Sequence, residues 1–141
     1  MKAFIAIALL LFTNINIFSQ ETEDAFLKDF LVGEFIIIGK KIESTETYTG
    51  SMIIENIKGK FKITRQIGDK KIICEAAIKE VLSGEIKVFI VYYTENKIDY
   101  EISYMIDTDF DNYTRLSGYF YKKGTYPKNP GLETAFCIHW N

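Results

Sequence analysis

The sequence predicts an all-β protein, a single eight-stranded antiparallel up-and-down β-barrel preceded by a short helix. From Val32 to the C-terminus, apolar and polar residues alternate in about eight short segments, a period of two that is typical of half-buried strands. Gly, Asn or Asp follows each segment, and the shortest of these turns require antiparallel neighbours. Because an open sheet would expose two edges, we expect the sheet to close.

The first element after the N-terminal segment is a predicted helix over Glu23–Leu31. Thr22 is a suitable cap, and two acidic residues stand at the helix start, where they interact favourably with the helix dipole. Apolar residues recur at helical spacing at Phe26, Leu27, Phe30 and Leu31.

The strands follow with short connections, and the clearest alternation lies between Lys97 and Ile106. There Ile98, Tyr100 and Ile102 fall on one face, while Asp99 and Glu101 fall on the other. The predicted strands, in order, are Val32–Gly39, Tyr48–Ile57, Phe61–Ile67, Lys71–Val81, Glu85–Tyr93, Lys97–Ile106, Tyr113–Lys122 and Leu132–His139.

The N-terminus has the layout of a secretory signal peptide, residues 1–19. Lys2 precedes an apolar run from Phe4 to Phe12, and a polar stretch ending at Ser19 follows. The run is shorter than the roughly 20 apolar residues that span a bilayer, so a membrane anchor is the weaker alternative. We expect cleavage near Ser19 or Gln20, one domain over 20–141, and export to the periplasm or the extracellular space.

The net charge argues against a nucleic-acid-binding protein, and the two cysteines raise the question of a disulfide. The net charge of −2 becomes −3 when Lys2 is removed with the signal peptide, and both signs are scattered, so no nucleic-acid partner is expected. Export would allow a disulfide between Cys74 and Cys137. In an eight-stranded meander, however, these residues lie on the fourth and eighth strands, on opposite walls, so two buried free thiols are the alternative.

Several segments resemble small exported bacterial barrels of the lipocalin/avidin (calycin-like) kind. Leu31–Phe35 is similar to the Gly-x-Trp start of lipocalin barrels, with Phe35 in place of the Trp. Further similar segments are Tyr48–Gly50, Gly68–Asp69, Leu116–Phe120 and Gly131–Thr134. The resemblance implies a closed barrel and bears on the fold more than on the function, because no biotin-binding constellation is present and no ligand identity carries over.

Arg65 is the leading candidate for a ligand contact. It shares a face with Phe61, Ile63 and Ile67, so alternation directs its guanidinium toward the apolar side of the sheet. A buried Arg needs a carboxylate partner or a bound anion, and its planar fork suits the head group of an anionic amphiphile. The alternative places Arg65 near the rim, with its head group in water.

Aromatic and apolar residues on the same faces form a candidate ligand cavity. Tyr100, Tyr104, Met52 and Ile54 would suit a small hydrophobic or amphipathic molecule with one or two polar groups. The same residues would equally form a solid core.

The loop after the sixth strand carries a candidate calcium site. Asp107, Asp109 and Asp111 alternate as in the start of a calcium loop. Asn112 and Gly118 occupy the positions of the loop's usual Gly and bidentate Glu, so an acidic, solvated loop is the alternative.

No motif points to catalysis or to a cofactor. His139 is the only histidine, and no nucleophile turn accompanies it, so we expect neither an enzyme nor a bound cofactor. The predicted function is a secreted or periplasmic binding protein for a small apolar or amphipathic ligand. The alternatives are a filled barrel that contacts other proteins and, with less support because the strands are short, an outer-membrane barrel.

Overall fold

The computed structural model describes residues 25–84, 86–107 and 114–139. The chain divides into two units, Met1–Leu31 and Val32–Asn141. In the first unit, residues 25–30 form an α-helix within the predicted range, and the Phe26 ring stacks on Phe30 with centroids 6.1 Å apart. The predicted signal peptide and its cleavage site lie outside the described residues. Within the described ranges, no helix is long and apolar enough to cross a membrane.

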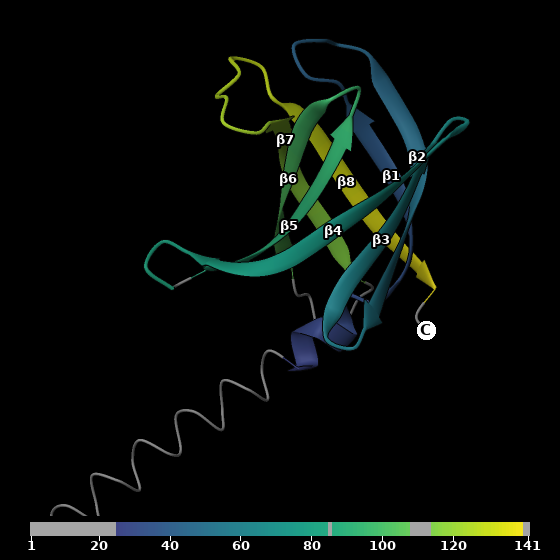
Figure 1. Ribbon diagram of the computed structural model, residues 1–141, viewed down its shortest axis with the longest axis vertical. Helices are drawn as coiled ribbons and strands as arrows, with labels where there is room; N and C mark the ends of the chain where they lie inside the picture. Colours follow the sequence, from purple (N-terminus) through teal and green to yellow (C-terminus); the bar gives the residue numbers. More distant parts are fainter. Residues whose placement is uncertain (1–24, 85, 108–113, 140–141) are drawn as a thin grey trace, which may run out of the picture. The chain divides into compact units, whose positions relative to one another are not determined.

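The second unit is a closed barrel of eight antiparallel strands in chain order, as predicted (Figure 1). Each strand pairs with the next one along the chain, and β1 also pairs with β8. The predicted strand ends lie within two residues of the observed ones. The strands are β1 (Gly33–Lys40), β2 (Thr47–Ile57), β3 (Lys60–Ile67), β4 (Lys70–Val81), β5 (Ile86–Glu95), β6 (Ile98–Asp107), β7 (Arg115–Lys122) and β8 (Gly131–His139).

Apolar side chains face the barrel interior. Phe35 and Ile37 of β1 are buried, whereas Ile36 and Ile38, which alternate with them, are 44% and 50% exposed. The register pairs Phe35 with Met52 of β2, so inward residues of neighbouring strands lie side by side. The continuous apolar run of β1 thus divides into an inner and an outer face.

The connections alternate between two ends of the barrel. The loop 41–46, the turns 68–69 and 96–97, and the loop 123–130 form the end at the top of Figure 1, which we call the upper end. The two residues of the turn 96–97 both have positive φ, 52° and 64°, the backbone conformation that closes a tight hairpin.

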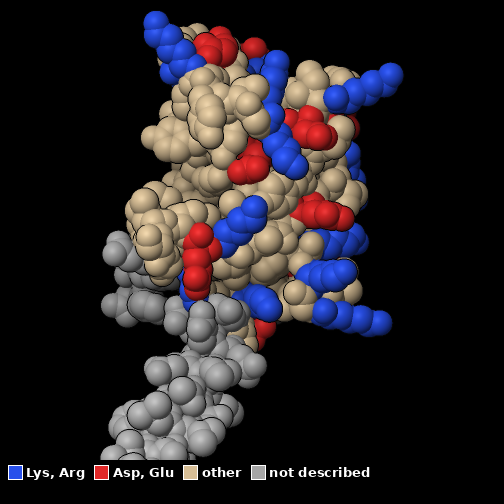
Figure 2. Space-filling view, turned by 60° about the vertical axis from the view of Figure 1, so that its left-hand side comes forward, with Lys and Arg blue, Asp and Glu red and all other residues tan. Residues whose placement is uncertain are grey.

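Charged side chains of both signs are mixed on the face of the molecule that Figure 2 shows. There Lys and Arg are interleaved with Asp and Glu. Cross-strand ion pairs contribute to this pattern, such as Lys62 with Glu55 at 3.5 Å. This distribution agrees with the scattered charge of the sequence.

Candidate functional site

Arg65 points into the barrel and is paired with a carboxylate of the same chain. Its side chain lies on the inner face of β3 and is 2% exposed, so the alternative of a rim position in water is wrong. The guanidinium reaches across the interior to Glu133 on β8, where Nη2 donates to Oε2. Glu133 is also 2% exposed. The carboxylate that a buried Arg needs is therefore supplied by the protein itself.

Two tyrosines complete this buried network. The Tyr48 hydroxyl donates to Oε2 of Glu133 at 2.6 Å, and the Tyr104 hydroxyl donates to Oε1. Arg65 also lies over the ring of Tyr93, with Cζ 5.3 Å from the ring centroid. The Glu133 carboxylate thus accepts three hydrogen bonds, which offset much of the cost of burying its charge.

The strand register explains how both tyrosines reach one carboxylate. Tyr104, Gly118, Glu133, Gly39 and Tyr48 form one row of cross-strand neighbours from β6 to β2. A glycine therefore stands on each side of Glu133, and each tyrosine lies one strand beyond. We call these five residues the Glu133 row.

Both glycines are places of close approach. The Tyr48 ring lies over Gly39, where a Cβ would stand 2.8 Å from the ring atom Cε2 and closer still to the hydroxyl end. A Cβ at Gly118 would stand 2.8 Å from the Cα of Tyr104 and would overlap the Ser103 carbonyl oxygen. The absence of side chains at both positions leaves Glu133 open to its partners.

Burial and the Glu133 charge hold the network in one protonation state. Burial, followed by the charge of Glu133, raises the pKa of Tyr48 and of Tyr104 well above the ordinary value. Burial alone would lower the pKa of Arg65, but the nearby Glu133 carboxylate reverses this and raises it. Both tyrosines are therefore neutral hydrogen-bond donors at physiological pH, and Arg65 is charged.

A cavity of about 530 Å³ lies at the upper end of the barrel. Its apolar lining comes from four side chains, Ile42, Ile67, Ile72 and Phe120. Three tyrosines also line it, Tyr48, Tyr93 and Tyr100. Tyr48 connects the cavity to the Glu133 row, so a buried polar network adjoins a mainly apolar hollow.

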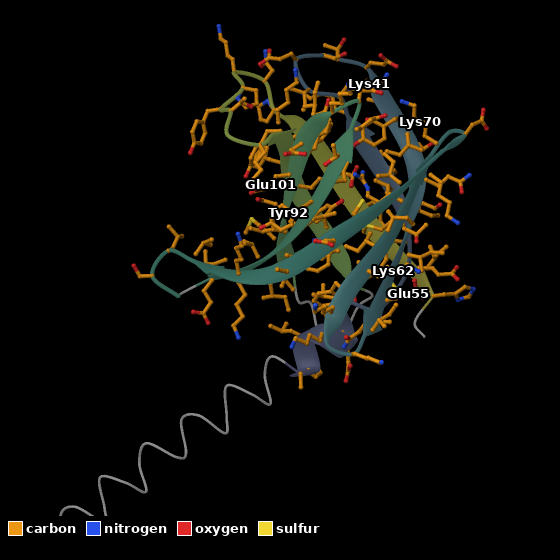
Figure 3. All side chains as sticks on the ribbon, viewed as in Figure 1. Lys41, Glu55, Lys62, Lys70, Tyr92 and Glu101 are labelled. Carbon is orange, nitrogen blue, oxygen red and sulfur yellow. The ribbon has the colours of Figure 1, made fainter. Side chains whose placement is uncertain are left out.

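Charged residues surround the rim of this cavity. Lys41 and Lys70, which Figure 3 labels at the upper end, both line it. Lys70 Nζ lies 2.5 Å from Oε1 of Glu95, and Lys41 Nζ lies 2.5 Å from Oε1 of Glu46. Lys122 also lines the rim. An amphipathic molecule would therefore meet charged groups where the cavity meets solvent.

The residues predicted to line a cavity separate into two groups. Tyr100 lines the cavity, where its ring stacks on Tyr93 with centroids 5.1 Å apart. Met52, Ile54 and Tyr104 are fully buried and do not belong to the cavity lining. The structure thus contains both a packed interior and a hollow, which the sequence left as alternatives.

The two cysteines are free and buried. Burial raises the pKa of the Cys74 thiol to about 11, and it also raises the pKa of Cys137. The structure thus agrees with the alternative of two buried thiols, which are protonated and weakly reactive at neutral pH.

The proposed calcium loop cannot be located. Asp109 and Asp111 lie outside the described residues, and only the backbone of Asp107 is described, at the end of β6. Within the described ranges, no cluster of three His, Cys, Asp or Glu side chains could hold a metal ion. The calcium site stays a prediction.

Glu133 is one of the site residues that the sequence did not indicate. The β8 strand carries apolar residues on both faces, with Leu132 and Phe136 more than 40% exposed and Ala135 buried. Alternation therefore could not assign its inner face. One indication was available, because a buried Arg65 demands a carboxylate and Glu133 alternates with Ala135 and Cys137.

Comparisons with known proteins found no matching family model, curated protein or solved structure. The closed eight-stranded barrel implied by the lipocalin/avidin resemblance is present. Membership of that family stays a prediction.

Proposed function

We propose that this protein is an exported binding protein that holds a small apolar or amphipathic molecule in the upper end of its barrel. The observation that carries this proposal is the cavity of about 530 Å³ with apolar and tyrosine walls. Its volume falls within the range of about 300 to 1,000 Å³ that is usual for small-molecule sites. An eight-stranded barrel is also the size that accommodates one small ligand.

The wall chemistry indicates which part of the ligand lies where. Ile67, Ile72 and the stacked Tyr93 and Tyr100 rings favour an apolar or aromatic body inside the cavity. A polar or anionic end would lie at the rim, close to Lys122. Arg65 would not contact the ligand itself, because its guanidinium is paired with Glu133 and it does not line the cavity.

A fluorescent probe tests this proposal. N-phenyl-1-naphthylamine is a neutral aromatic molecule whose emission rises in apolar surroundings, and we expect it to bind at micromolar concentration. Ile67→Trp fills part of the cavity and should weaken binding at least tenfold, since the ligand loses its space.

The matched control is Gln66→Trp, which adds the same ring on the exposed face of β3. It should leave the affinity unchanged. A wild-type protein that does not bind the probe, or equal affinities for wild type and Ile67→Trp, would overturn the proposed site.

Export is the second part of the proposal, and it rests on the sequence layout of residues 1–19. N-terminal sequencing of protein recovered from outside the cytoplasm should find a chain that starts at or next to Gln20. An intact chain retained in the cytoplasm would contradict export.

A further inference from the structure

The barrel is closed, but β4 and β5 are paired along only part of their length, and the pairing ends beside the cavity. Backbone pairing of these strands extends from Val81 and Ile86 to Glu75 and Tyr92, and stops there. Beyond that point, Lys70–Cys74 pairs with β3 and Tyr93–Glu95 pairs with β6, but these two segments do not pair with each other. Figure 1 shows β4 and β5 diverging toward the upper end. We call this unpaired part the β4–β5 seam.

One exposed ion pair connects the strands across the seam at the rim. Lys70 and Glu95 make this contact at 2.5 Å, with side chains 68% and 29% exposed. Exposed pairs of this kind contribute little, because water screens both charges and ordering two long side chains costs entropy. The ion pair therefore holds the two strands together only weakly at this point, and we call it the latch.

Two loops at the upper end, away from the seam, are held together more firmly. The loop 41–46 is joined to the neighbouring loop 123–130 by three hydrogen bonds between Glu43 and Asn129. The Glu43 amide donates to the Asn129 carbonyl at 2.9 Å, and the Asn129 amide and side chain donate to the Glu43 carboxylate at 3.2 and 3.4 Å. This loop contact involves more bonds than the single ion pair at the seam.

The cavity and a groove on the outer surface adjoin at the seam. This groove has a volume of about 590 Å³, and Ile73 and Tyr92 are among its lining residues. Tyr93 and Tyr100 line both the groove and the cavity. Their stacked rings thus border both the groove and the cavity.

We propose that the ligand of the cavity enters and leaves through the β4–β5 seam, over the Tyr93–Tyr100 stack, and that Lys70–Glu95 is the latch of this side entrance. The inference rests on the proposed function, because it assumes that the cavity is occupied. It assigns the outer groove as the first contact site for an apolar or aromatic ligand.

Stopped-flow fluorescence with N-phenyl-1-naphthylamine tests the route. The probe is neutral, so a charge reversal acts on the latch and not on the probe. Lys70→Glu places two carboxylates across the seam and should accelerate both association and dissociation of the probe by about two- to fivefold. The double variant Lys70→Glu/Glu95→Lys restores opposite charges and should restore the rates.

The matched control is Glu55→Lys, which places two cations across the fully paired β2–β3 seam. Figure 3 shows Lys62 and Glu55 away from the upper end. This variant should leave both rates unchanged. Equal rates in wild type and Lys70→Glu, or the same acceleration in Glu55→Lys, would overturn the side entrance while leaving the proposed function intact.

Absence of probe binding to the wild-type protein would instead remove the proposed function. Amide hydrogen exchange then tests, without any ligand, whether the strands at the seam separate more readily in Lys70→Glu than in wild type. We expect faster exchange in residues 70–74 and 93–95 of Lys70→Glu than of wild type, and unchanged exchange in β2 and β3. Unchanged exchange in the seam would overturn the latch.

Discussion

Glu133 places a carboxylate inside a mainly apolar barrel, where it accepts hydrogen bonds from Arg65, Tyr48 and Tyr104. Arg65 alone was visible in the sequence as an inward-facing charge. Its partner was not, because a contact between β3 and β8 depends on closure of the barrel and on the exact register. Residue chemistry predicted the need for a counter-charge, but not its position.

Removal of the Glu133 charge should destabilise the fold strongly. Glu133→Gln leaves Arg65 buried without a counter-charge, so we expect a loss of about 3 to 5 kcal/mol in the free energy of unfolding. The double variant Arg65→Met/Glu133→Gln removes both charges and should be more stable than Glu133→Gln. Urea unfolding measures both.

The exposed pair Lys62–Glu55 provides the control. Glu55→Gln should change the free energy of unfolding by less than about 1 kcal/mol. A loss of similar size for Glu133→Gln and Glu55→Gln would contradict the structural role of the buried pair.

Tyr93 should make stability depend on alkaline pH. Burial raises its pKa from 10.0 to about 12, against the opposing influence of the Arg65 charge. The stability linked to this hydroxyl is complete below pH 10, where folded and unfolded chains both hold the proton. It is lost between pH 10 and 12, because only the unfolded chain ionises there.

We therefore expect the free energy of unfolding to decrease as pH rises above 10, and to decrease less steeply in Tyr93→Phe. Urea unfolding at pH 8, 9, 10 and 11 compares the two proteins. Identical pH slopes for wild type and variant would contradict a raised pKa for Tyr93.

At the level of the strands, sequence alternation predicted the elements and their order well. It worked best for β6, where one face is apolar and the other is polar. It could not orient β1 or β8, whose apolar residues occur on both faces. Alternation also says nothing about where pairing stops, so the β4–β5 seam had no counterpart in the sequence.

Gly39 tests the geometry of the Glu133 row. A methyl group in Gly39→Ala would overlap the Tyr48 ring and push it from the Glu133 carboxylate. Overpacking of this kind costs about 1 to 3 kcal/mol. Thermal unfolding of the purified variant should show a correspondingly lower Tm.

The background variant Tyr48→Ala provides the control, since it removes the ring that Gly39 accommodates. In that background Gly39→Ala should cost much less than in wild type, which is the non-additivity expected for residues in contact. An equal loss of stability from Gly39→Ala in both backgrounds would show that Gly39 is not needed to accommodate the Tyr48 ring.

At the level of the whole molecule, the barrel combines a packed interior with a hollow upper end. Met52, Ile54 and Ile63 fill the interior, while the cavity is lined mainly by residues near the ends of strands. Neither the amino-acid composition nor the two-residue alternation could distinguish the packed interior from the cavity, because both regions are lined by the same apolar and aromatic residue types. The position along each strand decides which residues meet in the core and which border the hollow.

Native mass spectrometry of the protein purified from the cells that produce it tests the central claim, that the upper end holds a small molecule. The account predicts a reproducible adduct that organic solvent extracts, that is present in Gln66→Trp and that is absent from Ile67→Trp. An unliganded mass for the wild-type protein, or an adduct that survives in Ile67→Trp, would contradict it.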